Sequence, residues 1–245
     1  MIELQNVTAG YGGSPILRDI TLSFPPGTFT AIIGPNGCGK STLLKTAAGL
    51  LPLSGGSLSS PEPRAQQVAL LPQTRPVPQM TALQLALHGR FPWLRWPRQY
   101  RPEDEKLAFA ALQRMGVAEF AHVPLAQLSG GTRQKVYLAM ALTQDASTIL
   151  LDEPTTHLDI GCQFDLMKLC RELAHEGRAV AAVLHDLPLA LTHADRIALM
   201  TGGRLRFTGA PGEAVRLGIL DETFGIRVLE APTPAGTQYI CIPKP

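Results

Sequence analysis

Short apolar runs and amphipathic stretches follow one another along the chain, and their spacing predicts its elements. Ile2–Thr8 alternates loosely between apolar and polar residues, which is typical of a strand, and Ile16–Phe24, which follows a Gly-Gly turn, predicts a second strand. Thr28–Ile33 is a short apolar run and predicts a buried strand. In Ser41–Leu50 the apolar residues recur at helical intervals, and Gly49 marks the end of this predicted helix. The chain therefore begins with strands and then turns to a helix.

The alternation of buried strand and helix continues further along the chain. Val68–Leu71, Thr148–Leu151 and Ala179–Leu184 are short apolar runs that predict strands. Thr81–His88 and Pro102–Met115 predict helices, and the second opens with proline followed by acidic residues in its first turn. A parallel sheet covered by helices on both faces requires this order of elements. The pattern predicts an α/β fold.

Prolines are clustered, and the clusters indicate how the chain is organised. Among 245 residues there are 21 prolines. After the last predicted helix, Asp221–Phe224, residues Ile226–Ile242 predict a terminal hairpin around Pro232–Gly236. The middle group of prolines brackets a helical segment, about residues 74–146, that looks inserted into a larger α/β lobe. This group consists of Pro72, Pro76, Pro78, Pro92, Pro97 and Pro102.

Composition and charge limit the kinds of partner. The 22 Lys and Arg nearly cancel the 20 Asp and Glu, for a net charge of +2, whereas a nucleic-acid binder usually carries a concentrated basic excess. Hydrophobic residues make up 45% and charged residues 17% of the chain. Such a chain can bury a sizeable core and still expose apolar surface to a partner. We expect no nucleic-acid partner.

The sequence also predicts the cellular compartment. No apolar stretch approaches the roughly 20 residues that cross a bilayer, and Met1–Gln5 lacks the features of a signal peptide. Cys38, Cys162, Cys170 and Cys241 are scattered without CxxC spacing, so they predict reduced thiols and neither disulfides nor a zinc site. We expect a cytoplasmic protein.

One glycine-rich segment has the spacing of a phosphate-binding loop, GxxxxGK[ST]. It stands between the Thr28–Ile33 strand and the following helix, where glycines let backbone N–H groups turn toward phosphate oxygens. Lys40 would reach the β- and γ-phosphates, and Ser41 would place a hydroxyl on Mg²⁺. The alternative is a glycine-rich turn without a ligand. The candidate nucleotide-binding residues are Gly34, Pro35, Asn36, Gly37, Cys38, Gly39, Lys40, Ser41 and Thr42.

Two adjacent acids end the apolar run Thr148–Leu151. Side chains alternate in direction along a strand, so Asp152 and Glu153 can take different tasks. Asp152 suits the shell of a bound Mg²⁺, and Glu153 can polarise a water for attack on the γ-phosphate. The alternative is a solvated acidic strand end.

A third motif carries the resemblance to a known family. Ser129 is a good N-cap residue, and Gly130 and Gly131 leave the N–H groups of the next helix uncovered, which favours anion binding; the alternative is an ordinary capped helix. The segment Leu128–Thr132, which contains these residues, resembles the signature loop of the nucleotide-binding subunits of ATP-binding-cassette (ABC) transporters. One departure is Thr132, where that family commonly has glutamine.

The resemblance implies a fold and an assembly. It implies a phosphate-loop NTPase fold: a RecA-like core with an N-terminal antiparallel β-subdomain and an inserted α-helical subdomain. The nucleotide-binding domain would span residues 1–228, with the helical part at about 74–146, and residues 229–245 would form a short tail. The implied assembly is a homodimer that holds ATP between the phosphate loop of one copy and the signature loop of the other.

Four further residues match the family in the expected order. Tyr11 resembles the aromatic residue that stacks on adenine, and Gln73 resembles the glutamine that senses Mg²⁺ and the attacking water. Asp159 resembles an aspartate that crosses the dimer interface, and His185 resembles the switch histidine that contacts the γ-phosphate. The alternatives are a turn tyrosine, a surface glutamine and an incidental histidine at a strand end. The resemblance thus implies Glu153, His185 and Gln73 as catalytic residues, and Ser41, Gln73 and Asp152 as Mg²⁺ ligands.

The finer resemblance is to ATPases of bacterial importers for iron–siderophore complexes, haem or cobalamin. It lies in Gly89–Trp93 with Trp96, in Asp152–Ile160, which includes His157, and more weakly in Leu138–Leu142. An importer subunit of this kind works at the cytoplasmic face of the inner membrane, with permease subunits and, indirectly, a substrate-binding protein. The alternatives are an ATPase of an exporter or lipid transporter, and a soluble cassette ATPase of DNA repair or translation. The transported substrate is left open.

A segment rich in tryptophan and arginine is the candidate permease contact. Both tryptophans of the chain, Trp93 and Trp96, lie within Gln79–Pro102, and both residue types are enriched at the centres of protein interfaces. We expect Gln79–Pro102 to line a groove for a short cytoplasmic helix of a permease. The alternative is a helical lobe whose tryptophans fill its own core. The arginines of the segment are Arg90, Arg95, Arg98 and Arg101.

Overall fold

A six-stranded sheet forms the centre of the molecule. The computed structural model describes residues 1–156, 158–234 and 236–244. Within them, adjacent strands of the sheet are parallel except for the last pair. The strands, in spatial order, are β5 (Val68–Leu71), β6 (Thr148–Asp152), β7 (Ala179–Val183), β3 (Thr28–Ile33), β8 (Arg196–Thr201) and β9 (Arg204–Gly209).

The sheet separates two hydrophobic cores. Because side chains alternate along a strand, Ile149 and Leu151 of β6 enter one core and Leu150 enters the other. All five residues of β6 and all five of β7 are buried, as expected for strands covered on both faces. The α/β class predicted from the apolar runs is confirmed.

A second, antiparallel sheet covers one face. It has the order β2-β1-β4, formed by β1 (Ile2–Tyr11), β2 (Ser14–Phe24) and β4 (Leu53–Ser59). Its inward residues share a core with α1 (Lys40–Ala47), which follows β3. α1 ends at Ala47, three residues before the end of the predicted helix Ser41–Leu50. The antiparallel N-terminal sheet and the central sheet agree with the fold that the sequence predicted.

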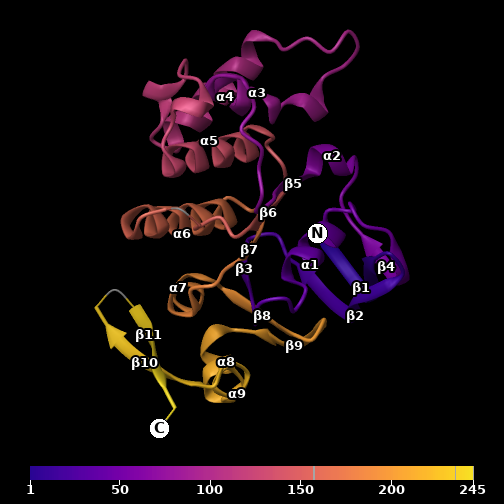
Figure 1. Cartoon of the computed structure of the whole chain (residues 1–245), viewed down its shortest axis with the longest axis vertical. Helices are drawn as coiled ribbons and strands as arrows, with labels where there is room; N and C mark the ends of the chain where they lie inside the picture. The colour runs from indigo at the N-terminus through magenta and orange to yellow at the C-terminus, as the bar shows by residue number, and fades with distance from the viewer. Residues whose placement is uncertain (157, 235, 245) are drawn as a thin grey trace.

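Three helices form a layer at one end of the molecule (Figure 1). They are α3 (Ala82–His88), α4 (Pro102–Arg114) and α5 (Gly130–Thr143), and they pack on one another. The short helical turns η1 (Phe91–Trp93), η2 (Ala118–Phe120) and η3 (Leu125–Gln127) connect them. α3 begins with a capping box, in which Thr81 Oγ accepts from the Gln84 N–H and Gln84 Oε1 accepts from the Thr81 N–H.

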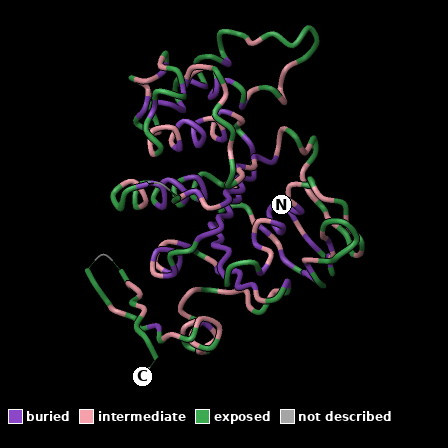
Figure 2. The backbone as a smooth tube through the Cα atoms, in the orientation of Figure 1, coloured by how far each residue is buried: buried purple, intermediate pink, exposed green. Residues whose placement is uncertain are grey.

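The remaining helices lie along the central sheet. α6 (Ile160–His175) packs on β3 and β7, and lies between the helical layer and α7 (Leu187–His193) in Figure 1. α2 (Arg64–Gln67) precedes β5, and α8 (Pro211–Arg216) and α9 (Ile219–Phe224) follow β9. The tube of Figure 2 is buried along the central strands and exposed at the periphery.

The chain ends in a hairpin. β10 (Ile226–Thr233) and β11 (Gly236–Pro243) pair with each other in a separate two-stranded sheet, and β11 packs on α7. The predicted hairpin Ile226–Ile242 has nearly these bounds. The division expected between residues 228 and 229 falls inside β10, because the pairing with β11 runs from Ile226 onward without interruption.

Candidate functional site

The phosphate-binding loop leaves β3 through a sharp turn that requires glycine. Gly34 has φ +150°, and a Cβ atom there would lie 2.2 Å from the Met200 carbonyl oxygen. Gly39 has φ +102° at the N-cap position of α1, where a Cβ would press on Ile16 and Leu17 at 3.2 Å. The loop thus follows a path that side chains would block, and it delivers the N-terminus of α1 to its centre.

Lys40 occupies the inside of this loop. Its Nζ donates to the carbonyl oxygens of Gly34 at 2.8 Å and Pro35 at 3.0 Å, and the residue is only 6% exposed. Pro35, Asn36 and Gly37 form the exposed outer side of the loop. The ammonium group is therefore held at the loop centre, where a phosphate-loop lysine acts as a point charge.

Ser41 and Asp152 bring two oxygen donors together. The hydroxyl of Ser41 donates to Asp152 Oδ1 at 3.0 Å, and Asp152 is only 3% exposed. Burial raises the pKa of the Asp152 carboxyl, the Ser41 hydrogen bond lowers it, and the Glu153 charge raises it again. A buried carboxylate beside a hydroxyl is a donor set that suits Mg²⁺, so these residues fit the ion that the motif implies.

Glu153 lies at the centre of a three-residue contact. Gln73 Nε2 donates to its Oε2 at 2.6 Å, and His185 Nε2 lies 2.6 Å from its Oε1. Glu153 also has φ +51°, a left-handed conformation that costs of order 1–3 kcal/mol and clusters at functional sites. The structure thus brings together the three residues expected to act in catalysis.

The sheet topology explains this convergence. β5, β6, β7 and β3 are parallel neighbours, so their carboxyl ends meet at one edge. Gln73 follows β5, Glu153 follows β6, His185 follows β7, and the phosphate loop follows β3. Ligands of open α/β sheets bind at this edge.

Sequence reasoning missed two residues beside Glu153. A cavity of about 430 Å³ is lined by Gln73, Arg75, Gln134 and Glu153, among others. The Arg75 guanidinium donates to Gln134 Oε1, and Gln134 Nε2 donates to the Pro154 carbonyl at 2.7 Å. These contacts tie the segment after Gln73 and the loop after Glu153 to helix α5. No motif marks either residue, because the contacts join segments far apart in the sequence.

The signature segment belongs to another part of the chain. Ser129 caps α5, with its Oγ accepting from the Thr132 N–H at 3.2 Å and lying 2.9 Å from Thr132 Oγ1. Gly130, exposed, and Gly131, half-exposed, form the first turn of α5. α5 packs on α3 and α4, whereas α1 packs on β1, β2 and β6. The two predicted anion sites thus begin helices that belong to different layers of one copy.

Among the described residues, Tyr11 and Asp159 form no hydrogen bond or ion pair with Glu153, Gln73 or His185. The Tyr11 side chain is exposed, with Lys45 Nζ 6.0 Å from its ring centroid. Asp159 caps α6 by accepting from the Cys162 N–H at 2.8 Å, and this N–H lowers the pKa of the Asp159 carboxyl. His157, part of the matched segment Asp152–Ile160, lies outside the described residues.

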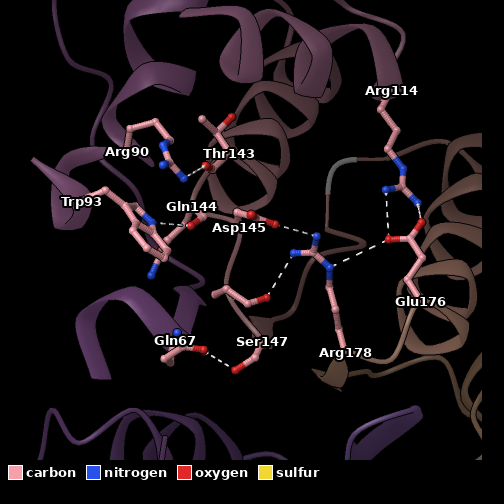
Figure 3. A network of polar contacts seen from close by, with 11 residues as sticks. Gln67, Arg90, Trp93, Arg114, Thr143, Gln144, Asp145, Ser147, Glu176 and Arg178 are labelled. Atoms are coloured by element: carbon pink, nitrogen blue, oxygen red, sulfur yellow. Dashed lines mark hydrogen bonds and ion pairs between the residues drawn. The ribbon is translucent and has the colours of Figure 1, made fainter. Parts of the chain in front are cut away.

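The two tryptophans of Gln79–Pro102 have different environments. Trp93 is half-buried, and its indole N–H donates to the Gln144 carbonyl at 2.7 Å beside Arg90 (Figure 3). Trp96 is 91% exposed. Trp93 therefore packs within the helical layer, as the alternative interpretation predicted, whereas Trp96 is exposed and can contact a partner.

The fold and the site together define a phosphate-loop protein that binds a nucleoside triphosphate at the carboxyl edge of its sheet. The ABC transporter family profile matches residues 17–156. The chain is 38% identical to the ferric enterobactin transport ATP-binding protein FepC of Escherichia coli (strain K12) over 248 residues, covering 96% of this chain and 92% of FepC. It is 39% identical to the hemin import ATP-binding protein HmuV of Rhodococcus jostii (strain RHA1) over 252 residues, covering 98% and 85%.

A solved structure agrees with this likeness. The dimeric structure of MJ0796, a bacterial ABC transporter cassette, superposes with a TM-score of 0.76 at 29% identity, covering 86% of this chain and 99% of that one. The chain belongs to the ABC transporter family. It is a nucleotide-binding ATPase cassette, as the signature segment predicted. In the part of the chain that the structure describes, no helix has the length and apolar character to cross a membrane.

Proposed function

We propose that this chain is the ATP-hydrolysing subunit of a bacterial importer for an iron–siderophore, haem or cobalamin-type substrate. The observation that carries the proposal is the contact of Gln73 and His185 with Glu153, beside the Ser41–Asp152 pair and the phosphate loop. Relatives named for ferric enterobactin and hemin support iron-containing cargo. The permease and an external binding protein, and not this subunit, would contact that cargo.

The residues divide the work of hydrolysis. The phosphate loop and Lys40 bind the triphosphate, and Tyr11 stacks on the base. Ser41, Asp152 and Gln73 would hold Mg²⁺, which neutralises phosphate charge when bound. Glu153 accepts a proton from the attacking water, and Gln73 and His185 orient its carboxylate.

The proposed working unit is a homodimer. Ser129, Gly130 and Gly131 of one copy complete the nucleotide site of the other, with Asp159 at the interface. The placement of α5 against α3 and α4, and of α1 against β1, β2 and β6, supports this arrangement, since the two loops begin helices of different layers. Closure would drive the permease because the closed dimer binds ATP more tightly than the open one. The subunit would sit on the cytoplasmic face of the inner membrane and contact the permease through Gln79–Pro102.

Two experiments test the proposal. Glu153→Gln should trap the pre-hydrolysis state, so the purified variant should become dimeric in Mg-ATP by light scattering, whereas Glu153→Gln combined with Lys40→Ala should stay monomeric. A variant that stays monomeric in saturating Mg-ATP, with or without its permease, would overturn the dimer. Co-purification with an apolar membrane protein supports transport, and co-purification with ribosomes or nucleic acid contradicts it.

A further inference from the structure

The segment between η1 and α4 forms a projecting tip. Arg95–Gln99, here called the tip, is a run of five exposed residues. In Figure 1 the segment between η1 and α4 extends from the helical layer at the end of the molecule far from the C-terminus, and in Figure 2 it is largely exposed. A projecting, exposed segment of this kind is accessible to an extended surface.

The base of the tip is fixed by several contacts. The Arg90 guanidinium lies 4.9 Å from the Trp93 ring centroid and pairs with Asp104 Oδ1 at 2.9 Å. Asp104 Oδ2 accepts from the Arg101 N–H at 3.0 Å, and Trp93 is bonded to Gln144 (Figure 3). Because both ends of the segment are anchored, the tip is presented with less conformational entropy to lose on binding.

The tip combines cationic and aromatic side chains. Residues 89–101 contain four arginines and no acidic residue. Among the described residues, Arg90 is the member of this group that forms an ion pair. The next acids, Glu103, Asp104 and Glu105, are in the first turn of α4, where they offset the partial positive charge of the helix N-terminus, and Asp104 is the partner of Arg90. Arg95 and Arg98 are exposed and form no ion pair among the described residues, and the Arg98 guanidinium lies 5.2 Å from the Phe91 ring centroid.

A hollow beside the tip offers guanidinium groups to a phosphate headgroup. The cavity has a volume of about 570 Å³, and its lining includes Arg90, Arg95 and Arg101, the aromatic residues Trp96 and Tyr100, and one acid, Asp104, which pairs with Arg90. Arg95 and Arg101 form no ion pair among the described residues, and guanidinium groups bind phosphate through paired N–H donors. Exposed tryptophan is typical of the membrane interface, where an amphipathic ring lies at headgroup level.

We propose that the tip, Arg95–Gln99, binds the anionic phospholipid headgroups of the membrane surface. Arg95 and Arg98 supply the electrostatic attraction, and Trp96 enters the interfacial layer. This contact is distinct from docking to the permease, because it needs no second protein. It would orient the subunit on the bilayer before or during assembly with its membrane partner.

Vesicle co-sedimentation of the purified full chain tests the proposal. The chain should bind vesicles in which phosphatidylglycerol replaces part of the phosphatidylcholine, bind pure phosphatidylcholine weakly, and lose binding as salt rises. Arg95→Gln with Arg98→Gln should lower the partition coefficient by about 25-fold, roughly fivefold for each arginine. Trp96→Ser should lower binding as well.

Matched variants remove the same groups elsewhere. Arg204→Gln with Arg227→Gln deletes two exposed arginines, and Leu217→Ser deletes an exposed apolar side chain. The proposal is wrong if these controls lose as much binding as the tip variants, or if the unmodified chain binds both vesicle types equally. Thermal midpoints of all variants check that folding is retained.

A permease contact gives a different result. The second assay measures association of the chain with nanodiscs that hold the permease. If the tip binds lipid, Arg95→Gln with Arg98→Gln should reduce this association more in nanodiscs that contain phosphatidylglycerol than in nanodiscs of phosphatidylcholine alone. An equal loss of association in both lipids would assign the tip to the permease and overturn the lipid proposal. The vesicle assay contains no permease, so its outcome is separate from that of the transport function.

Discussion

The side-chain amide of Gln73 donates a 2.6 Å hydrogen bond to Glu153 Oε2, across 80 residues of sequence. The other carboxylate oxygen of Glu153 lies against His185. Both oxygens of the proposed general base therefore have partners, and the carboxylate direction is set by two separate loops. A residue that aims a base through a hydrogen bond acts on turnover more than on substrate affinity.

Replacing Gln73 by alanine should remove one of the two contacts that orient the Glu153 carboxylate. We expect kcat for ATP hydrolysis to fall about 10- to 100-fold, the scale of one hydrogen bond to a charged group, while KM changes less. Steady-state phosphate release over a range of ATP concentrations measures both. Gln5→Ala, at an exposed glutamine of β1, is the matched control. An effect on KM alone would contradict the positioning role.

Glu153→Gln should have a larger effect than the loss of its partner. Removing a general base typically lowers the rate by about 100-fold or more, while the amide preserves side-chain shape and nucleotide binding. Lys40→Ala should instead weaken nucleotide binding itself, because it removes the charge held at the centre of the phosphate loop. Binding of a fluorescent ATP analogue, measured beside phosphate release, separates the two. Near-normal hydrolysis by Glu153→Gln would refute its assigned role.

The carboxyl edge of the sheet was predictable because each motif directly follows an apolar run. Asp152, His185 and the phosphate loop each end a short buried strand, and parallel strands place such ends together. Arg75 and Gln134 were not predictable, because their contact depends on how the helical layer packs on the core. The separate environments of Trp93 and Trp96 also depend on packing, because Gln144 lies 51 residues from Trp93.

Cys38 should react slowly with thiol reagents. From the position of Cys38 in the phosphate loop alone, we would expect its alkylation to inactivate the protein and bound ATP to protect the thiol. In the structure Cys38 is only 4% exposed, and burial raises the pKa of its thiol, which lowers the fraction of reactive thiolate at neutral pH. We therefore expect little alkylation of Cys38 even without nucleotide, and faster modification at higher pH.

Peptide mass spectrometry after timed iodoacetamide treatment measures this directly. Cys162 is half-exposed and serves as the internal reference, because it lies on α6 away from the loop. Cys38 modified as fast as Cys162 in nucleotide-free protein would contradict the packing of the loop. Cys170, which is buried with a thiol pKa raised to about 12, should remain unmodified throughout.

Asp152→Asn should stabilise the nucleotide-free protein while abolishing hydrolysis. Burial raises the pKa of this carboxyl in the folded chain, so its contribution to stability is lost as pH rises through the folded pKa. The amide removes that charge and can still accept the hydrogen bond from Ser41. Because the Ser41 hydrogen bond offsets part of the cost of burial, we expect a gain of about 1 kcal/mol or less, or at most about 2–4 °C in Tm.

Two further measurements of Tm, one over a range of pH and one with Mg-ATP, distinguish the removal of a buried charge from general repacking around residue 152. The difference in Tm between wild type and Asp152→Asn should shrink as pH falls below the raised pKa, where both side chains are neutral. Asp165→Asn, at an exposed carboxylate of α6, should change little at any pH. Saturating Mg-ATP should reverse the order, because ligand binding stabilises the wild type and the variant lacks the carboxylate that suits Mg²⁺. A variant that is less stable than wild type at neutral pH would show that the carboxylate supports the fold, and the proposed division between stability and function at this residue would fail.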